Sequence, residues 1–88
     1  MKEPIIRNGV KLYNRVPVDP GIYFYYNNAR VIGSSRIGVV EITPDRELIG
    51  EGVGCFPLSR ISDRRGILKN EDADLYFSDL TVEQIVEV

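Results

Sequence analysis

The 88-residue sequence predicts an all-β, or mostly β, domain made of successive antiparallel hairpins. Turn signals at Asn8-Gly9, Asn27-Asn28 and Pro44-Asp45 separate runs that are rich in β-branched and aromatic residues. No long stretch has the apolar period of a helix. We therefore expect one small β domain over residues 1–88, an antiparallel barrel or roll of about five to six strands, SH3-like or OB-like in size. A two-layer sandwich is the alternative.

The N-terminal part of the chain predicts a small first hairpin. Residues 4–7 and 10–13 are apolar-containing runs on either side of the Asn8-Gly9 turn, which is the strongest short hairpin signal. Residues 14–20 contain two prolines and an aspartate, a composition that resists both a helix and a central strand. We expect them to form a connecting loop.

The stretch from Gly21 to Gly33 predicts a central hairpin, because strand formers flank two asparagines that tolerate the positive φ of a tight turn. A two-residue turn pairs Tyr25 with Arg30 and sorts the side chains onto two faces. The expected core face carries Ile22, Phe24, Tyr26, Ala29 and Val31. The expected outer face carries Tyr23, Tyr25, Arg30 and Ile32, with Arg30 over the Tyr25 ring.

Residues 37–43 predict the next strand, and the turn at Pro44-Asp45 returns the chain into a strand over residues 47–54. Glycines at 50, 52 and 54 share one parity there, which predicts a strip without side chains on a tightly bent strand, or alternatively a strip covered by a ligand. The core of the whole domain is expected to include Ile22, Phe24, Val31, Val39 and Ile49.

The C-terminal part predicts a short strand at residues 75–77 and then either a helix or a strand over residues 82–88. Thr81 and Gln84 have the spacing of a helix capping box, whereas the β-branched residues that follow favour a strand. Acidic residues gather from Glu71 onward, after a basic segment that holds Arg60, Arg64 and Arg65. We expect the acidic end to fold back near this basic segment.

Composition excludes several classes of chemistry. The sequence has no histidine, which removes Ser-His-Asp and Cys-His catalysis and zinc-finger ligation. Cys55 is the only cysteine, so it is expected to be a buried small hydrophobe in a reducing compartment. Apolar runs are far too short to span a bilayer. We therefore predict a protein without a cofactor or metal, not an enzyme, in the cytoplasm or associated with a virion.

Gly21-Ile22-Tyr23 followed by Val31-Ile32-Gly33 is similar to the paired motifs of the GIY-YIG nucleases. The second motif has Val31 where that family has tyrosine, and the sequence that follows predicts a strand instead of a helix with the family's arginine. The resemblance therefore carries over no nuclease residue.

The sequence predicts a non-catalytic protein–protein interaction or assembly module that acts within a larger complex or particle. Tyrosine and arginine are enriched at protein interfaces. The expected partner-binding residues are Tyr23, Tyr25, Arg30, Arg36, Arg60, Arg64 and Arg65. A homo-oligomer is a further option for the partner, and a membrane is not.

Two other functions stay open. A single-stranded nucleic-acid-binding β-barrel would stack bases on the Tyr/Arg face, although a sequence pI of about 5.0 argues against a basic field. A small metal-dependent enzyme built on Asp72 and Asp74 is the third hypothesis, because carboxylates are ligands for hard cations.

Overall fold

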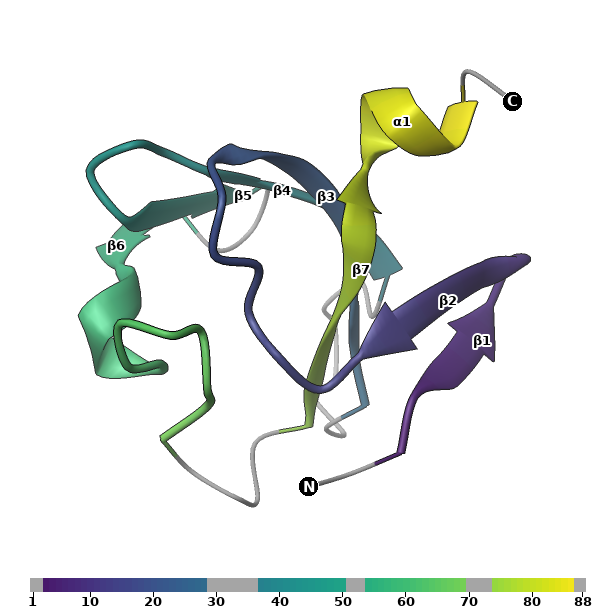
Figure 1. Cartoon of the computed structure of the whole chain (residues 1–88), viewed down its shortest axis with the longest axis horizontal. Coiled ribbons are helices and arrows are strands. Elements are labelled where there is room, and N and C mark those ends of the chain that lie inside the picture. Colours follow the sequence, from purple (N-terminus) through teal and green to yellow (C-terminus); the bar gives the residue numbers. More distant parts are fainter. Residues whose placement is uncertain (1–2, 29–36, 51–53, 70–73, 87–88) are drawn as a thin grey trace.

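The computed structural model describes residues 3–28, 37–50, 54–69 and 74–86. Antiparallel strands form one seven-stranded sheet in the order β1-β2-β7-β3-β4-β5-β6 (Figure 1). The elements are β1 (Ile5–Arg7), β2 (Val10–Tyr13), β3 (Gly21–Asn27), β4 (Ile37–Ile42), β5 (Glu47–Gly50), β6 (Gly54–Pro57), the 3₁₀ turn η1 (Leu58–Arg60), β7 (Leu75–Thr81) and the helix α1 (Val82–Val86). The all-β class and the short C-terminal helix are confirmed. Within these residues β1 and β6 end the sheet without pairing with each other, so the sheet is open.

The first hairpin forms as predicted. Asn8 and Gly9 have φ angles of 51° and 78°, and two consecutive positive values are what a type I′ turn requires. The turn sets the register that pairs Arg7 with Val10 and Ile5 with Leu12.

The central hairpin differs from the prediction in its turn and its register. β3 pairs with β4, so Tyr25 lies opposite Gly38 and not opposite Arg30. The other edge of β3 pairs with β7, where Phe77 is the partner of Tyr25. The predicted two-residue turn at Asn27-Asn28 is therefore wrong, and residues 29–36 lie outside the described part of the chain. β4 pairs with this edge of β3 because all six of its residues find partners along β3.

The strand predicted over residues 47–54 is two strands. β5 and β6 form a hairpin in which Gly50 lies opposite Gly54, and Gly54 takes a φ of 74°. The strip of glycines along one strand is therefore wrong, and residue 52 lies outside the described residues. The preceding turn is confirmed, because the Arg46 N–H donates to the Thr43 carbonyl at 3.0 Å.

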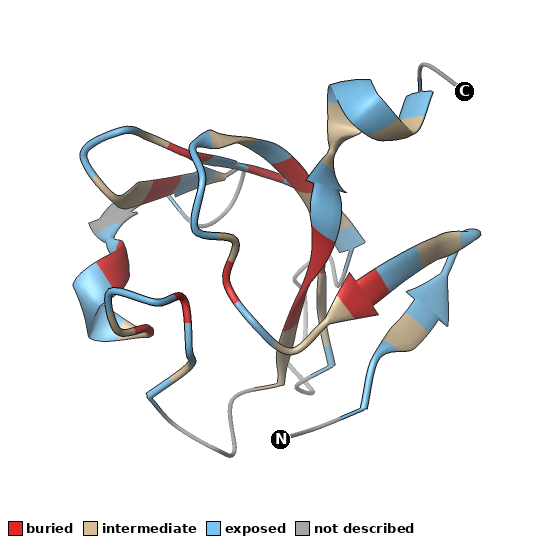
Figure 2. Ribbon diagram, in the orientation of Figure 1, coloured by how far each residue is buried: buried red, intermediate tan, exposed pale blue. Residues whose placement is uncertain are grey.

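The main buried cluster lies on one face of the sheet, under the loop 14–20 and the segment 58–69, and Figure 2 shows buried residues on the strands and on both covering segments. Its buried members are Val16, Tyr23, Tyr25, Val40, Ile42, Leu48, Leu58 and Phe77. Leu12 and Tyr76 are also buried but lie outside this cluster. The predicted core face is thus the wrong face: Ile22, Val39 and Ile49 are exposed, Phe24 is half-buried, and Val31 is outside the described residues.

The predicted core face and outer face of β3 are exchanged in the structure. β3 has apolar side chains on both faces, so the alternation of its residues does not show which face is buried. The segments that cover the sheet determine which face becomes the core. The loop 14–20 lays the fully buried Val16 over the face of Tyr23 and Tyr25. The Tyr23 hydroxyl then donates to the Asp19 carbonyl at 2.8 Å, so its polar end has a partner although the ring is buried.

α1 begins with the capping box that the sequence predicts. The Thr81 N–H donates to the Gln84 side-chain oxygen at 2.9 Å, and the Gln84 N–H donates to the Thr81 hydroxyl at 3.2 Å. These reciprocal bonds end β7 and start the helix. Among the described residues, no helix is long and apolar enough to cross a membrane.

Candidate functional site

The side of the sheet opposite the core carries a group of exposed apolar side chains around the half-buried Phe24, which together we call the apolar face: Ile22, Phe24, Ile37, Val39 and Ile49. They lie on three adjacent strands, β3, β4 and β5. Phe24 is the direct cross-strand partner of Val39, and such partners share a face of a sheet. The apolar face is therefore one continuous surface and not a set of scattered side chains.

A cavity of about 300 Å³ lies where the β1–β2 hairpin meets the apolar face. The lining residues are Arg7, Asn8, Val10, Leu12, Phe24, Ile37, Gly38 and Val39. Val10 and Leu12 reach it because the alternation along β2 sends both side chains to the same side. Sequence reasoning missed this contribution of the first hairpin, although the Asn-Gly turn and the Val-Lys-Leu alternation carried the signal.

Opposite charges stand at two ends of the apolar face. The Arg7 guanidinium lies 4.8 Å from the centre of the Tyr26 ring and donates to the Ile6 carbonyl, and it makes no ion pair with any carboxylate of the described residues. Glu41 is exposed and stands between Ile22 on β3 and Ile49 on β5, its cross-strand partners. The face is thus apolar at its centre, positive at one end and negative at the other.

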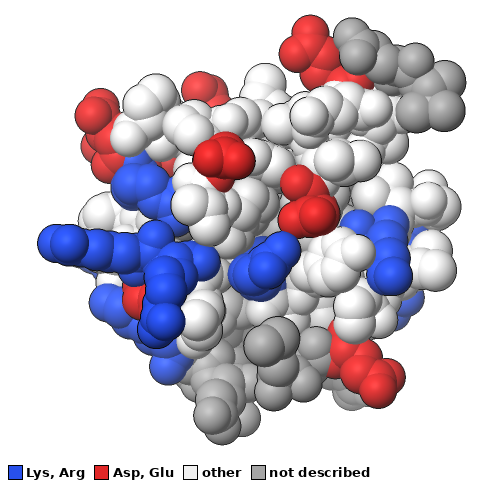
Figure 3. All heavy atoms as spheres, in the orientation of Figure 1, with Lys and Arg blue, Asp and Glu red and all other residues white. Residues whose placement is uncertain are grey.

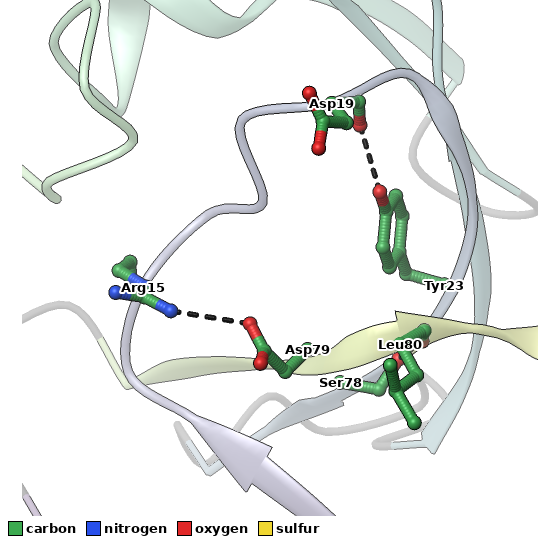
Figure 4. Close-up of polar contacts among 6 residues, drawn as sticks. All are labelled: Arg15, Asp19, Tyr23, Ser78, Asp79 and Leu80. Carbon is green, nitrogen blue, oxygen red and sulfur yellow. Dashed lines mark hydrogen bonds and ion pairs between the residues drawn. The ribbon is translucent and has the colours of Figure 1, made fainter. Parts of the chain in front are cut away.

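Two of the predicted partner-binding residues belong to the core. Tyr23 is 3% exposed and Tyr25 is 9% exposed, so neither ring forms part of a surface platform. Burial raises the pKa of the Tyr23 hydroxyl because it disfavours the phenolate, and the charges of Asp19 and Asp79 raise it further. Figure 4 shows the Tyr23 hydroxyl pointing to the Asp19 carbonyl. Arg30 and Arg36 lie outside the described residues.

The other predicted partner-binding residues, Arg60, Arg64 and Arg65, are exposed on η1 and the loop after it, and Figure 3 shows Lys and Arg side chains gathered on that side of the molecule. Asp63 accepts hydrogen bonds from the backbone N–H groups of Ile67 at 3.0 Å and Arg65 at 2.8 Å. The bond from Ile67 lowers the pKa of Asp63, desolvation partly opposes it, and the bond from Arg65 lowers it further.

The described acidic residues Asp79 and Glu83 do not lie beside these arginines, contrary to the prediction, and Glu71, Asp72 and Glu87 are outside the described residues. Asp79 pairs with Arg15 at 3.1 Å (Figure 4), and α1, which carries Glu83, lies across the molecule from η1 (Figure 1). The reason is that β7 runs through the middle of the sheet and delivers its C-terminal end beside the loop 14–20. Among the described carboxylates, the one that pairs with the basic segment is its own Asp63, 3.7 Å from Arg65.

Cys55 is exposed, contrary to the prediction of a buried thiol. It lies on β6 at the edge of the sheet, where its sulfur donates to a Glu47 carboxylate oxygen at 2.7 Å. This hydrogen bond raises the pKa of the Cys55 thiol, because the carboxylate stabilises the protonated form and repels the thiolate.

A raised thiol pKa leaves less thiolate at pH 8, so Cys55 should be alkylated by iodoacetamide more slowly than an unstructured cysteine. The Glu47→Gln variant should react severalfold faster, and its rate should reach half-maximum at a lower pH. Mass spectrometry of timed samples measures both rates. Glu83→Gln, a change on α1, serves as the control, and an unchanged rate in Glu47→Gln would contradict the assignment.

The structure describes only one of the two aspartates of the metal hypothesis. Asp72 lies outside the described residues, and the Asp74 carbonyl accepts a hydrogen bond from the Asn28 N–H at 2.8 Å. In the described ranges, no group of three or more Cys, Asp or Glu side chains is placed to hold a metal ion.

Comparisons with known proteins find no similar protein. No family model matches the sequence, and neither the curated proteins nor the solved structures contain a match.

Proposed function

We propose that this chain is a non-catalytic protein–protein interaction or assembly module that acts within a larger complex or particle. The observation that supports this most strongly is the apolar face. Ile22, Val39 and Ile49 are 50%, 47% and 40% exposed on neighbouring strands. Single exposed apolar residues are ordinary, but a continuous group beside an apolar cavity is typical of a site that another molecule covers.

The composition of the apolar face favours a protein as that molecule. Aliphatic side chains and Phe24 at the centre, with positive charge at one end and negative charge at the other, resemble the apolar core and polar rim of a protein interface. A nucleic-acid backbone requires a field of positive charge, and Glu41 lies within this face. The nucleic-acid alternative also loses its stacking platform, because Tyr23 and Tyr25 are buried.

The absence of catalysis is supported by the chemistry of the chain. Histidine is missing from the sequence, and the exposed thiol of Cys55 is held protonated by Glu47. A nucleophile needs a base or a lowered pKa, and here the pKa is shifted the other way.

The test is crosslinking and capture from cells that express the protein, with Val39→Asp compared with Val86→Asp. Both variants place a carboxylate at an exposed valine, but Val86 lies on α1 and not on the three strands that carry the apolar face. The protein recovered with the wild-type chain should be lost with Val39→Asp and kept with Val86→Asp. Recovery of nucleic acid whose retention falls steeply with salt would overturn the proposal, and equal recovery with both variants would show that the wrong face was chosen.

A further inference from the structure

We infer that the apolar face binds the same face of a second copy of this chain across a two-fold axis. This rests on the proposed function and names its partner. The apolar face has two halves that differ in shape and charge. One half is the cavity of about 300 Å³, with Arg7 at its rim. The other half is a ridge, a row of exposed side chains across three strands: Ile22, Glu41 and Ile49.

The charges of the two halves are too far apart to pair within one chain. Arg7 lies over Tyr26, whose partner on β4 is Ile37. Glu41 is four residues further along β4, which corresponds to about 13 Å of extended strand. Accordingly, no ion pair joins Arg7 to Glu41 in the described part of the chain. Each half therefore combines apolar side chains with a charge that has no ion-pair partner among the described residues.

A second copy supplies the complement of both halves. With a two-fold axis that lies between the faces and crosses the line from Arg7 to Glu41, the ridge of each copy stands opposite the cavity of the other. In such a contact each pairing is made twice. Ile22 or Ile49 of the ridge then meets the cavity, and an engineered cavity of about 150 Å³ is already enough for benzene. Arg7 of each copy meets Glu41 of its partner, so shape and charge agree.

The purified protein tests this by light scattering after gel filtration over a range of concentrations. The expected mass is twice the 10.0 kDa of the chain. Arg7→Glu and Glu41→Arg should each raise the dissociation constant of the dimer by at least about tenfold, because like charges then face each other twice. An equimolar mixture of the two variants should form dimers again, since each Glu then meets an Arg. The double variant should do the same.

Lys11→Glu is the matched control. Lys11 pairs with Ile6, so its side chain lies on the opposite face of the β1–β2 hairpin from Arg7. It should dimerise like the wild-type chain. Far-ultraviolet circular dichroism checks the fold of each variant, and heterodimer formation in the mixture requires that both single variants are folded.

Three results would overturn the inference: a monomer at every concentration, a mass that keeps growing with concentration, or a mixture of the two single variants that stays monomeric. If the chain is monomeric and Val39→Asp still abolishes capture of another protein, the proposed function stands with a different partner. If neither association is found, both the inference and the proposed function fail.

Discussion

Gly66→Ala is expected to unfold the domain or to lower its free energy of unfolding by about 2–5 kcal/mol. Gly66 has a φ of 80°, and a β-carbon there would stand 2.1 Å from the Val16 carbonyl oxygen. The left-handed backbone costs alanine roughly 1–2 kcal/mol, and the overlap adds roughly 1–3 kcal/mol. Neither backbone is free to move apart, because the Val16 N–H donates to the Gly66 carbonyl at 2.8 Å.

Urea unfolding followed by circular dichroism measures this loss, and Gly54→Ala separates its two causes. Gly54 has a similar φ of 74°, but a β-carbon there would have no other atom within 4 Å. Its substitution should cost only the backbone contribution of roughly 1–2 kcal/mol. If the two variants lose the same stability, the close approach of Val16 to Gly66 is not a constraint on the fold.

Val40→Asp is expected to lower the free energy of unfolding by more than about 4 kcal/mol, whereas Val39→Asp should change it by about 0.5 kcal/mol. The two residues are adjacent on β4 and chemically identical, but Val40 is 2% exposed and Val39 is 47% exposed. At position 40 the carboxylate would be buried among Tyr23, Leu48 and Phe77. At position 39 it would stay in water.

Chemical denaturation of the two variants is the direct measurement of which side of the sheet is the core. Val39→Asp should also lose self-association, while its circular dichroism spectrum stays that of the wild-type chain. A Val39→Asp variant that unfolds, beside a stable Val40→Asp variant, would mean that the faces of β4 are assigned the wrong way round.

The features that the sequence predicts correctly depend on neighbouring residues alone. Asn8-Gly9 makes its turn because both residues accept positive φ, and Thr81 with Gln84 caps α1 because Gln84 lies three positions after Thr81. The strand over residues 37–42 is also local, since it follows from a run of β-branched residues. Such rules need no knowledge of the rest of the chain.

The predictions that are wrong concern features that depend on residues distant in sequence. Nothing near Tyr25 indicates that its partners are Gly38 and Phe77, and nothing in β3 says which face the loop 14–20 will cover. The prediction of the site is wrong for the same reason as the prediction of the core face. With the faces inverted, the sequence assigns the buried tyrosines to a binding surface and gives no role to Arg7 and Glu41, although the inferred interface needs both.

The central position of β7 also determines the order in which the sheet is completed. β1 and β2 form one unit and β3 to β6 another, each from strands that follow one another along the chain, so their loops close at low entropic cost. Among the described strands, pairing joins the two units only through β7, which comes after both. During synthesis the facing edges of β2 and β3 therefore stay unpaired until β7 has left the ribosome. Open edges attract other strands, and this interval is when a nascent chain needs protection from its neighbours.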